Sequence, residues 1–240
     1  MPEATLPILP RSFVAIAYWL LAAVSIAVIP LGPFTALPLL RMAPTVLLAA
    51  TSLRATRSRF GTTIAWGLFF GAWGDFFLAT FDNSVAGLGV LAFFVGHACY
   101  ITGLRRSGWH VTPLRRALVA SLIVFGIGYG AVIAWINPHI PVPRLGNLAV
   151  APVLLAYMPA LIGMASVAVL RQGSRLLAAG ALVFVASDAM IPLNQFLLPK
   201  AHATDLYATD WLLLSGFVTY YGAQWWIARG AEMDAGQPLG

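Results

Sequence analysis

The segment Gly61–Thr80, GTTIAWGLFFGAWGDFFLAT, is apolar enough to cross a lipid bilayer and yet contains Asp75. A second apolar segment, Leu176–Leu197, contains Asp188. A charged side chain at the centre of a bilayer costs about 2.5–3.5 kcal/mol on insertion scales, so such a residue normally faces the interior of a helix bundle. The two aspartates are therefore the first candidates for a functional site.

The composition indicates an integral membrane protein. Of the 240 residues, 60% are hydrophobic and 9% are charged, whereas a soluble domain is about half apolar and about a quarter charged. The formal net charge of +6 does not indicate nucleic-acid binding, because the arginines lie in short loops between apolar segments. The single cysteine, Cys99, lies within an apolar segment and excludes an intrachain disulfide.

Apolar stretches of about 20 residues, the length of a membrane-spanning helix, predict a bundle of eight transmembrane helices. This all-α arrangement forms one integral membrane domain over residues 1–240. The second span is the least regular, because Pro38, Arg41 and Pro44 interrupt it. The first span follows a segment without a basic cluster, so we expect a retained helix rather than a cleaved signal. The expected spans are 13–30, 34–52, 61–80, 85–104, 117–136, 148–170, 176–197 and 211–229.

The basic residues of the loops predict the orientation. Arg144 and Lys200 fall on one side of the expected spans, and all other loop and terminal arginines fall on the opposite side. By the positive-inside rule the arginine-rich side is cytoplasmic, which places both termini in the cytoplasm and requires an even number of spans. The arginine-rich side contains Arg11, Arg54, Arg57, Arg59, Arg105, Arg106, Arg115, Arg116, Arg171, Arg175 and Arg229.

Depth and helical spacing bring other polar residues toward the aspartates. At a rise of 1.5 Å per residue, Asp75 and Asp188 lie about 20 Å and about 18 Å from the cytoplasmic ends of their spans. Gly67 and Gly71 precede Asp75 at intervals of four, and such a stripe of small residues lets helices approach closely. Pro192 has no N–H for the carbonyl group of Asp188, so we expect the helix to kink or open there. Candidate supporting residues are Arg41, His97, Tyr100, Tyr157, Ser187, Asn194, Tyr220, Tyr221 and Gln224.

Each candidate also has a purely structural interpretation. Either aspartate can form an ion pair with Arg41 that serves packing rather than chemistry. His97 can bond to a backbone carbonyl, and the tyrosines can be core or interfacial aromatics. The chain has no HxxxH or HExxH metal spacing, no phosphate loop and no GxSxG nucleophile elbow. The sequence therefore predicts neither a metal nor a cofactor.

Four motifs occur in a fixed order along the chain: GAWGDFFL at 71–78, FFVGHACY at 93–100, GALVFVASD at 180–188 and YYGAQ at 220–224. Their order and spacing, with eight spans, resemble the YhhN-type lysoplasmalogenase family over nearly the whole chain. Family members often carry a Lys directly before a Pro in the second span, whereas here Ala43 precedes Pro44 and the basic residue is Arg41. The resemblance implies an integral protein of the bacterial inner (plasma) membrane that takes a lipid substrate from the bilayer.

The resemblance also implies hydrolysis of the vinyl-ether bond of lysoplasmalogens, which releases a fatty aldehyde and a glycerophospho-base. Protonation of the carbon β to the ether oxygen gives an oxocarbenium ion, which water captures. An apolar site raises the pKa of a carboxyl group, and a second acid separates the two pKa values. One of Asp75 and Asp188 is then expected to donate the proton while the other stabilises the cation and orients the water. His97 and Tyr100 would hold a carboxyl group or the glycerol oxygens.

Two other functions use some of these features. A proton-coupled transporter also has paired membrane acids and a broken helix, and acids in the third and seventh spans hint at a four-plus-four repeat. The similarity between the two halves is faint, which counts against this alternative. A lipid-binding or scaffold protein needs no acid at membrane depth. A closed, lipid-accessible pocket favours the enzyme, and gates at both faces favour the transporter.

Overall fold

Eight α-helices make up the regular structure of the described residues, which confirms the number of helices predicted from the apolar stretches. The computed structural model describes residues 11–29, 34–55, 58–80, 85–106, 108–136, 150–197 and 211–235. No β-strand occurs among these residues, so the predicted all-α class is also confirmed. The helices are α1 (Arg11–Ala27), α2 (Leu37–Ala55), α3 (Arg59–Ala79), α4 (Ala86–Leu104), α5 (Pro113–Ile136), α6 (Val150–Leu170), α7 (Arg175–Leu197) and α8 (Trp211–Ala235).

Local chemistry sets the starts of α3 and α5. Ser58 precedes α3, and its side chain accepts a hydrogen bond from the backbone N–H of Gly61 at 3.1 Å, as in an N-cap. α5 begins at Pro113, earlier than the predicted span, because proline is favoured in the first turn of a helix. The Thr112 hydroxyl accepts from the backbone N–H of Arg115 at 3.3 Å and caps this earlier start.

The prolines within the helices do not break them. α2 continues through Pro44, and α7 continues to Leu197 past Pro192. α7 therefore does not open beside Asp188, whereas a kink at Pro192 stays a prediction. A proline ring loosens the carbonyl groups of the preceding turn, and here the Tyr129 hydroxyl of α5 donates to the carbonyl of Ala189 at 3.0 Å. A hydrogen bond from a neighbouring helix thus supports the backbone at this point.

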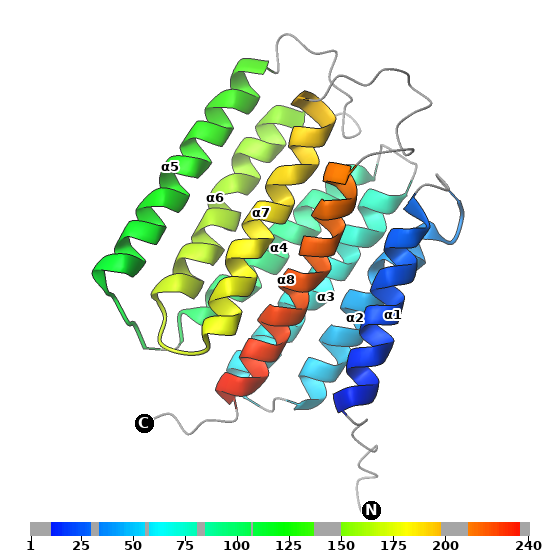
Figure 1. Cartoon of the computed structure of the whole chain (residues 1–240), viewed down its shortest axis with the longest axis horizontal. Coiled ribbons are helices and arrows are strands. Elements are labelled where there is room, and N and C mark those ends of the chain that lie inside the picture. The colour runs from blue at the N-terminus through cyan, green and yellow to red at the C-terminus, as the bar shows by residue number, and fades with distance from the viewer. Residues whose placement is uncertain are drawn as a thin grey trace, which may run out of the picture.

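The helices α3, α4, α7 and α8 form the middle of the bundle (Figure 1). α8 packs along α7 and also contacts α3, α2 and α1, while α3 packs between α2 and α4. α6 contacts α4, α5 and α7. α5 lies at one edge of the bundle and α1 at the other (Figure 1). Side chains from α2, α3, α4, α6, α7 and α8 can therefore meet in the interior.

Glycines allow α3 to approach α4 and α8 closely, as the stripe of small residues before Asp75 predicts. A Cβ atom at Gly67 would lie 2.3 Å from the ring of Tyr100 on α4. A Cβ atom at Gly71 would lie 3.1 Å from Nε2 of Gln224 on α8. The two glycines therefore leave the space that Tyr100 and Gln224 occupy on the Asp75 side of α3.

The turn between α6 and α7 is fixed against the end of α8. Arg171 and Asp234 form a salt bridge with 2.5 Å between Nη1 and Oδ2, and the backbone N–H of Ser174 donates to Oδ1 of Asp234 at 2.7 Å. Gly173 has a φ of 150°, a conformation that favours glycine. These contacts explain why α8 extends to Ala235, beyond the predicted end at 229.

The described loop arginines lie at one end of the bundle. Consecutive helices run in opposite directions, so α1 begins and α8 ends at the same end (Figure 1). Every described arginine except Arg41 lies at or near this arginine-rich end. Arg57, Arg144 and Lys200 lie outside the described residues. The one-sided distribution is confirmed for the described part of the chain, whereas the cytoplasmic location of this end stays a prediction.

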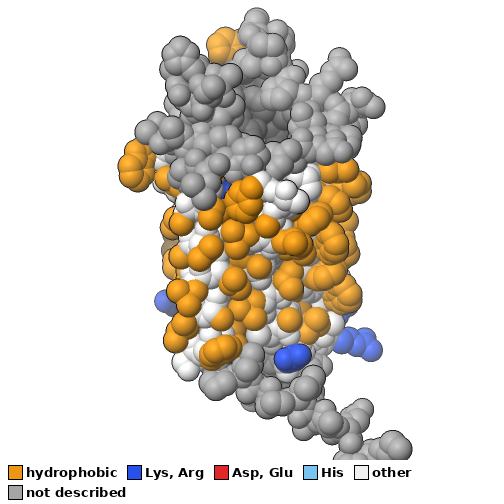
Figure 2. All heavy atoms as spheres, turned by 90° about the vertical axis from the view of Figure 1, so that its right-hand side faces the viewer, with side chains coloured by type: hydrophobic (Ala, Val, Ile, Leu, Met, Phe, Trp, Pro, Cys, Tyr) orange, Lys and Arg blue, Asp and Glu red, His pale blue; other side chains and the backbone are white. Residues whose placement is uncertain are grey.

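Much of the outer surface of the bundle is apolar. Figure 2 shows hydrophobic side chains along the face beside α1, with most of the visible arginine side chains at one end. Ile16, Leu20 and Leu39 on this side are each at least 61% exposed. Within the described residues, two helical segments, Gly87–Leu104 and Pro113–Val132, are long and apolar enough to cross a membrane. The helices are observed, and their arrangement as eight membrane spans remains a prediction.

The orientation can be tested with reporter fusions. A reporter that is active only in the periplasm is expected to be inactive when fused after Gly240, because the arginine-rich end is predicted to be cytoplasmic. The same reporter inserted within 137–149, at the opposite end, is expected to be active and serves as the control. A periplasmic signal after Gly240 would show that the predicted orientation is wrong.

Candidate active site

Asp75 is buried on α3, where α2 and α8 meet it. The Tyr220 hydroxyl of α8 donates to Oδ2 of Asp75 at 2.8 Å, and the Thr45 hydroxyl of α2 donates to the same oxygen at 3.3 Å. Asp75 also has a Coulombic attraction to Arg41 on α2. Two helices, α2 and α8, thus supply groups that stabilise charge on one carboxyl group of α3.

A directed chain of hydrogen bonds leads to Asp75. The Tyr100 hydroxyl of α4 donates to Oε1 of Gln224 at 2.9 Å, and Nε2 of Gln224 donates to the Tyr220 hydroxyl at 3.0 Å. The amide of Gln224 has one accepting end and one donating end, so it sets the direction of the chain. Tyr220 accepts from Gln224 and therefore gives its own proton to Asp75. We call Tyr100, Gln224, Tyr220, Thr45 and Asp75 the Asp75 network.

Asp188 belongs to a second chain of hydrogen bonds. The Tyr157 hydroxyl of α6 donates to Oδ2 of Asp188 in a short hydrogen bond. Nε2 of His97 on α4 lies 2.5 Å from the Tyr157 oxygen. We call His97, Tyr157 and Asp188 the Asp188 network. His97 and Tyr157 are buried, and Asp188 is partly buried.

The hydrogen-bond directions determine the form of the His97 ring. Because Tyr157 uses its one proton toward Asp188, Nε2 of His97 must donate to the Tyr157 oxygen. In a neutral ring the other nitrogen, Nδ1, is then an acceptor. Nδ1 is buried and has no hydrogen-bond partner within the described part of the chain. A buried acceptor without a hydrogen-bond partner is uncommon. Nδ1 can therefore accept a hydrogen bond from a bound molecule.

Phe184 of α7 lies between the two networks. Its ring centroid is 5.2 Å from that of His97 and 5.4 Å from that of Tyr220. α4 also joins the networks, since His97 and Tyr100 have ring centroids 6.3 Å apart. The structure therefore brings most of the predicted residues into two adjoining networks rather than into one hydrogen-bonded cluster.

Tyr221 and Arg41 belong to a separate contact of α1, α2 and α8. The Tyr221 hydroxyl donates to the carbonyl of Arg41 at 3.1 Å and lies 2.8 Å from the Ser25 oxygen. The Tyr18 hydroxyl donates to the Tyr221 carbonyl at 2.6 Å. The guanidinium of Arg41 lies over the ring of Phe217, 3.8 Å from its centroid. This contact joins α1, α2 and α8. Arg41 acts on the site through the attraction between its positive charge and Asp75.

Ser187 joins neither network in the described structure. The Ser187 hydroxyl donates to the carbonyl of Gly216 at 2.8 Å and so binds α7 to α8. Asn194 lies on α7, but its side chain is outside the described residues. Ser187 is therefore placed as a packing residue, and the prediction for Asn194 stays untested.

Two residues of the site, Thr45 and Phe184, were not predicted from the sequence. Thr45 lies four positions after Arg41, so both fall on one face of α2. Phe184 lies four positions before Asp188, on the same face of α7. Their spacing of four positions from Arg41 and from Asp188 is the feature of the sequence that could have indicated them. Neither residue type draws attention by itself in an apolar helix.

Comparisons with known proteins point to one family. The model of the YhhN family matches residues 36–231, which contain both networks. Proteins named lysoplasmalogenase from Mycobacterium bovis and Mycobacterium tuberculosis are each 30% identical to this chain over 189 residues. The alignment covers 75% of this chain and 69% of each relative. No solved structure matches the chain significantly.

The close approach at Gly67 predicts a loss of stability on substitution. Gly67→Ala is expected to displace the Tyr100 ring and to lower the free energy of unfolding by about 1–3 kcal/mol, the usual cost of overpacking. Gly128→Ala is the matched control, because a Cβ atom there meets nothing within 4 Å. Thermal unfolding in detergent measures both. Equal melting temperatures for the two variants would contradict the close packing of α3 on α4.

Proposed function

Because the chain belongs to the YhhN family, we propose that it is a membrane-embedded hydrolase that cleaves the vinyl-ether bond of lysoplasmalogens. The products would be a fatty aldehyde and glycerophosphocholine or glycerophosphoethanolamine. The observation that carries the proposal is the pair of aspartates inside an apolar bundle, each accepting a hydrogen bond from a tyrosine hydroxyl. The names of the relatives support a lysoplasmalogenase-like hydrolase. They give no support to the transporter alternative.

The proposed reaction needs one protonated and one ionised carboxyl group. The protonated acid gives its proton to the carbon β to the ether oxygen, which leaves an oxocarbenium ion. The carboxylate stabilises this cation and takes a proton from the water that attacks it. The resulting hemiacetal breaks into the aldehyde and the free glycerol hydroxyl. In our proposal Asp75 and Asp188 supply the two carboxyl groups, because two acids that share one apolar site favour a state in which only one of them is ionised.

The tyrosines orient the carboxyl groups for these transfers. Tyr220 and Tyr157 both bind the Oδ2 atom of their aspartate. In our proposal the Oδ1 atoms exchange protons with the substrate or the water. A tyrosine donor also stabilises the carboxylate that remains after a proton has been given away.

His97 is proposed to recognise the hydroxyl group that distinguishes a lysolipid from a two-chain lipid. A lysoplasmalogen has a free hydroxyl on the carbon next to its ether-linked carbon. Nδ1 of His97 is a buried acceptor within the Asp188 network. A hydrogen bond from the substrate hydroxyl would satisfy it and place the vinyl ether near Asp188.

We propose an integral membrane protein with eight spans that takes its lipid substrate from the bilayer, which the apolar outer surface supports. The arginine-rich end supports a cytoplasmic location of both termini. Large exposed apolar surfaces are rare on soluble monomers. At 1.5 Å per residue, Asp75 lies about 6 Å from the end of α3 at Ala79, and Asp188 lies about 14 Å from the end of α7 at Leu197. The site is therefore nearer the end opposite the arginines.

The first test of this function is aldehyde release. Purified wild-type protein is expected to release aldehyde from lysoplasmenylcholine, and Asp75→Asn and Asp188→Asn are each expected to lower kcat by about 100-fold or more, the range of general acid–base catalysis. The double variant should be little slower than either single variant, because the two acids act as a unit. A chelator should leave the wild-type rate unchanged.

The control for the aspartate variants is Ser187→Ala, which alters only a contact between α7 and α8. It should keep most of the activity if it remains monodisperse in detergent. Substantial turnover in either Asp→Asn variant would show that this aspartate has a structural role.

The role of His97 can be separated from that of Tyr157 with two substrates, one with and one without the free hydroxyl. His97→Ala is expected to reduce the preference for the hydroxylated substrate, measured as a ratio of kcat/KM, by about tenfold, the value of one neutral hydrogen bond. Tyr157→Phe should slow both substrates equally, because Tyr157 contacts Asp188. An unchanged preference in His97→Ala would refute the assignment of His97.

A further inference from the structure

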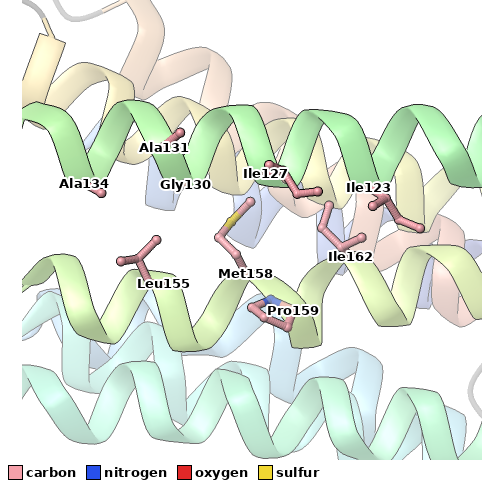
Figure 3. A pocket seen from close by; sticks show the side chains of 10 residues that line it. Ile123, Ile127, Gly130, Ala131, Ala134, Leu155, Met158, Pro159 and Ile162 are labelled. Atoms are coloured by element: carbon pink, nitrogen blue, oxygen red, sulfur yellow. The ribbon is translucent and has the colours of Figure 1, made fainter.

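An apolar groove lies between α5 and α6 (Figure 3). Its volume is about 480 Å³, within the range of about 300–1,000 Å³ that is usual for small-molecule sites. All of its lining residues are glycine, alanine, proline, methionine or aliphatic, among them Ile127, Gly130, Leu155 and Met158. Ile127 is 68% exposed and Leu155 is 40% exposed, so the groove reaches the outer surface of the bundle.

Residues next to the lining of the groove reach the Asp188 side of the candidate active site. On α6, Met158 lines the groove, while its neighbour Tyr157 donates to Asp188. On α5, Gly130 lines the groove, while its neighbour Tyr129 donates to the carbonyl next to Asp188, that of Ala189. Tyr129 also interacts electrostatically with Asp188. Adjacent residues of both helices thus face the groove and the candidate active site.

Small residues on α5 keep the groove open. A Cβ atom at Gly130 would lie 3.2 Å from Cδ2 of Leu155, and one at Gly126 would lie 3.0 Å from Cγ1 of Ile162. Larger side chains at these positions would fill the space between the helices. Gly128 lies on the same helix outside the groove, where a Cβ atom meets nothing within 4 Å.

We propose that this groove binds the hydrocarbon chain of a single-chain lipid substrate and places its ether-linked end at Asp188. The inference rests on the proposed function and assigns the part of the site that selects chain length. A lining without hydrogen-bonding side chains suits a hydrocarbon chain and not a headgroup. The position of the groove favours a substrate chain over a second copy of this protein, because Tyr157, next to the lining residue Met158, donates to Asp188.

The first experiment measures chain-length selectivity. In Gly130→Leu, the ratio of kcat/KM for a long-chain over a short-chain lysoplasmalogen is expected to fall by about tenfold, or about 1.4 kcal/mol, which is comparable to burying two methylene groups. Gly128→Leu carries the same change outside the groove and should keep the wild-type ratio. Ala134→Phe, which fills the groove at an exposed position, provides a second variant if Gly130→Leu does not fold.

The second experiment does not depend on turnover. An alkyl-ether lysolipid with a diazirine in its chain is photolysed with the full-length protein, and the labelled residues are identified by mass spectrometry. Label is expected on the groove residues of α5 and α6 in the wild type and in Gly128→Leu, and much less in Gly130→Leu or Ala134→Phe. Label on the groove of a protein that releases no aldehyde would support the chain site and reject the proposed reaction.

Three results would overturn the groove assignment. One is an unchanged chain-length ratio in folded, active groove variants. Another is photolabel that falls mainly on other helices. The third is a dimer that Gly130→Leu dissociates while the chain-length ratio stays the same, which would show that the groove is an interface between two copies of the chain.

Discussion

The hydrogen bond from Tyr220 to Asp75 is the interaction around which the centre of this bundle is arranged. A buried carboxyl group in an apolar interior is tolerated only when other groups satisfy it. Tyr220 can serve because α8 lies against both α3 and α7, and because Gly71 leaves room for Gln224 behind it. The small residues of α3 are therefore required for the hydrogen bonds to Asp75, because they make room for the side chains that form these bonds. A larger residue at either glycine of the α3 stripe would disturb these bonds.

The same requirement explains why α4 contributes to both networks. Tyr100 begins the chain of donors that ends at Asp75, and His97 begins the chain of donors that ends at Asp188. The two residues lie three positions apart, on one face of the helix. Phe184 fills the space between the networks and keeps them in contact without a direct hydrogen bond. Such an arrangement keeps two acids close in an apolar environment while giving each its own donors, which suits the proposed division between a proton donor and a carboxylate.

The ends and the edge of the bundle serve different purposes. At the arginine-rich end, Arg171, Ser174 and Asp234 hold the turn between α6 and α7 against α8. At the edge, α5 packs on α6 over glycines and alanines and leaves the apolar groove. The tightly packed side supports the acids, and in our proposal the groove binds the hydrocarbon chain of the substrate. A hydrolase of single-chain lipids needs both, because its substrate has one polar end and one long apolar end.

The sequence by itself determined the number and type of the helices, the one-sided distribution of the described arginines and the choice of Asp75 and Asp188. Hydropathy and charge are local properties. The free-energy cost of a charge in lipid identifies each acid as unusual within its own helix. Contacts between helices are not local, so only the tertiary structure decided which donor serves which acid. It separated one expected cluster into two networks, placed Ser187 and Tyr221 in hydrogen bonds between helices, added Thr45 and Phe184, and continued α7 as a helix past Pro192. Those outcomes depend on the orientation of α8 and α4 about their own axes relative to α3. The spacing of residues within a single helix does not determine that orientation.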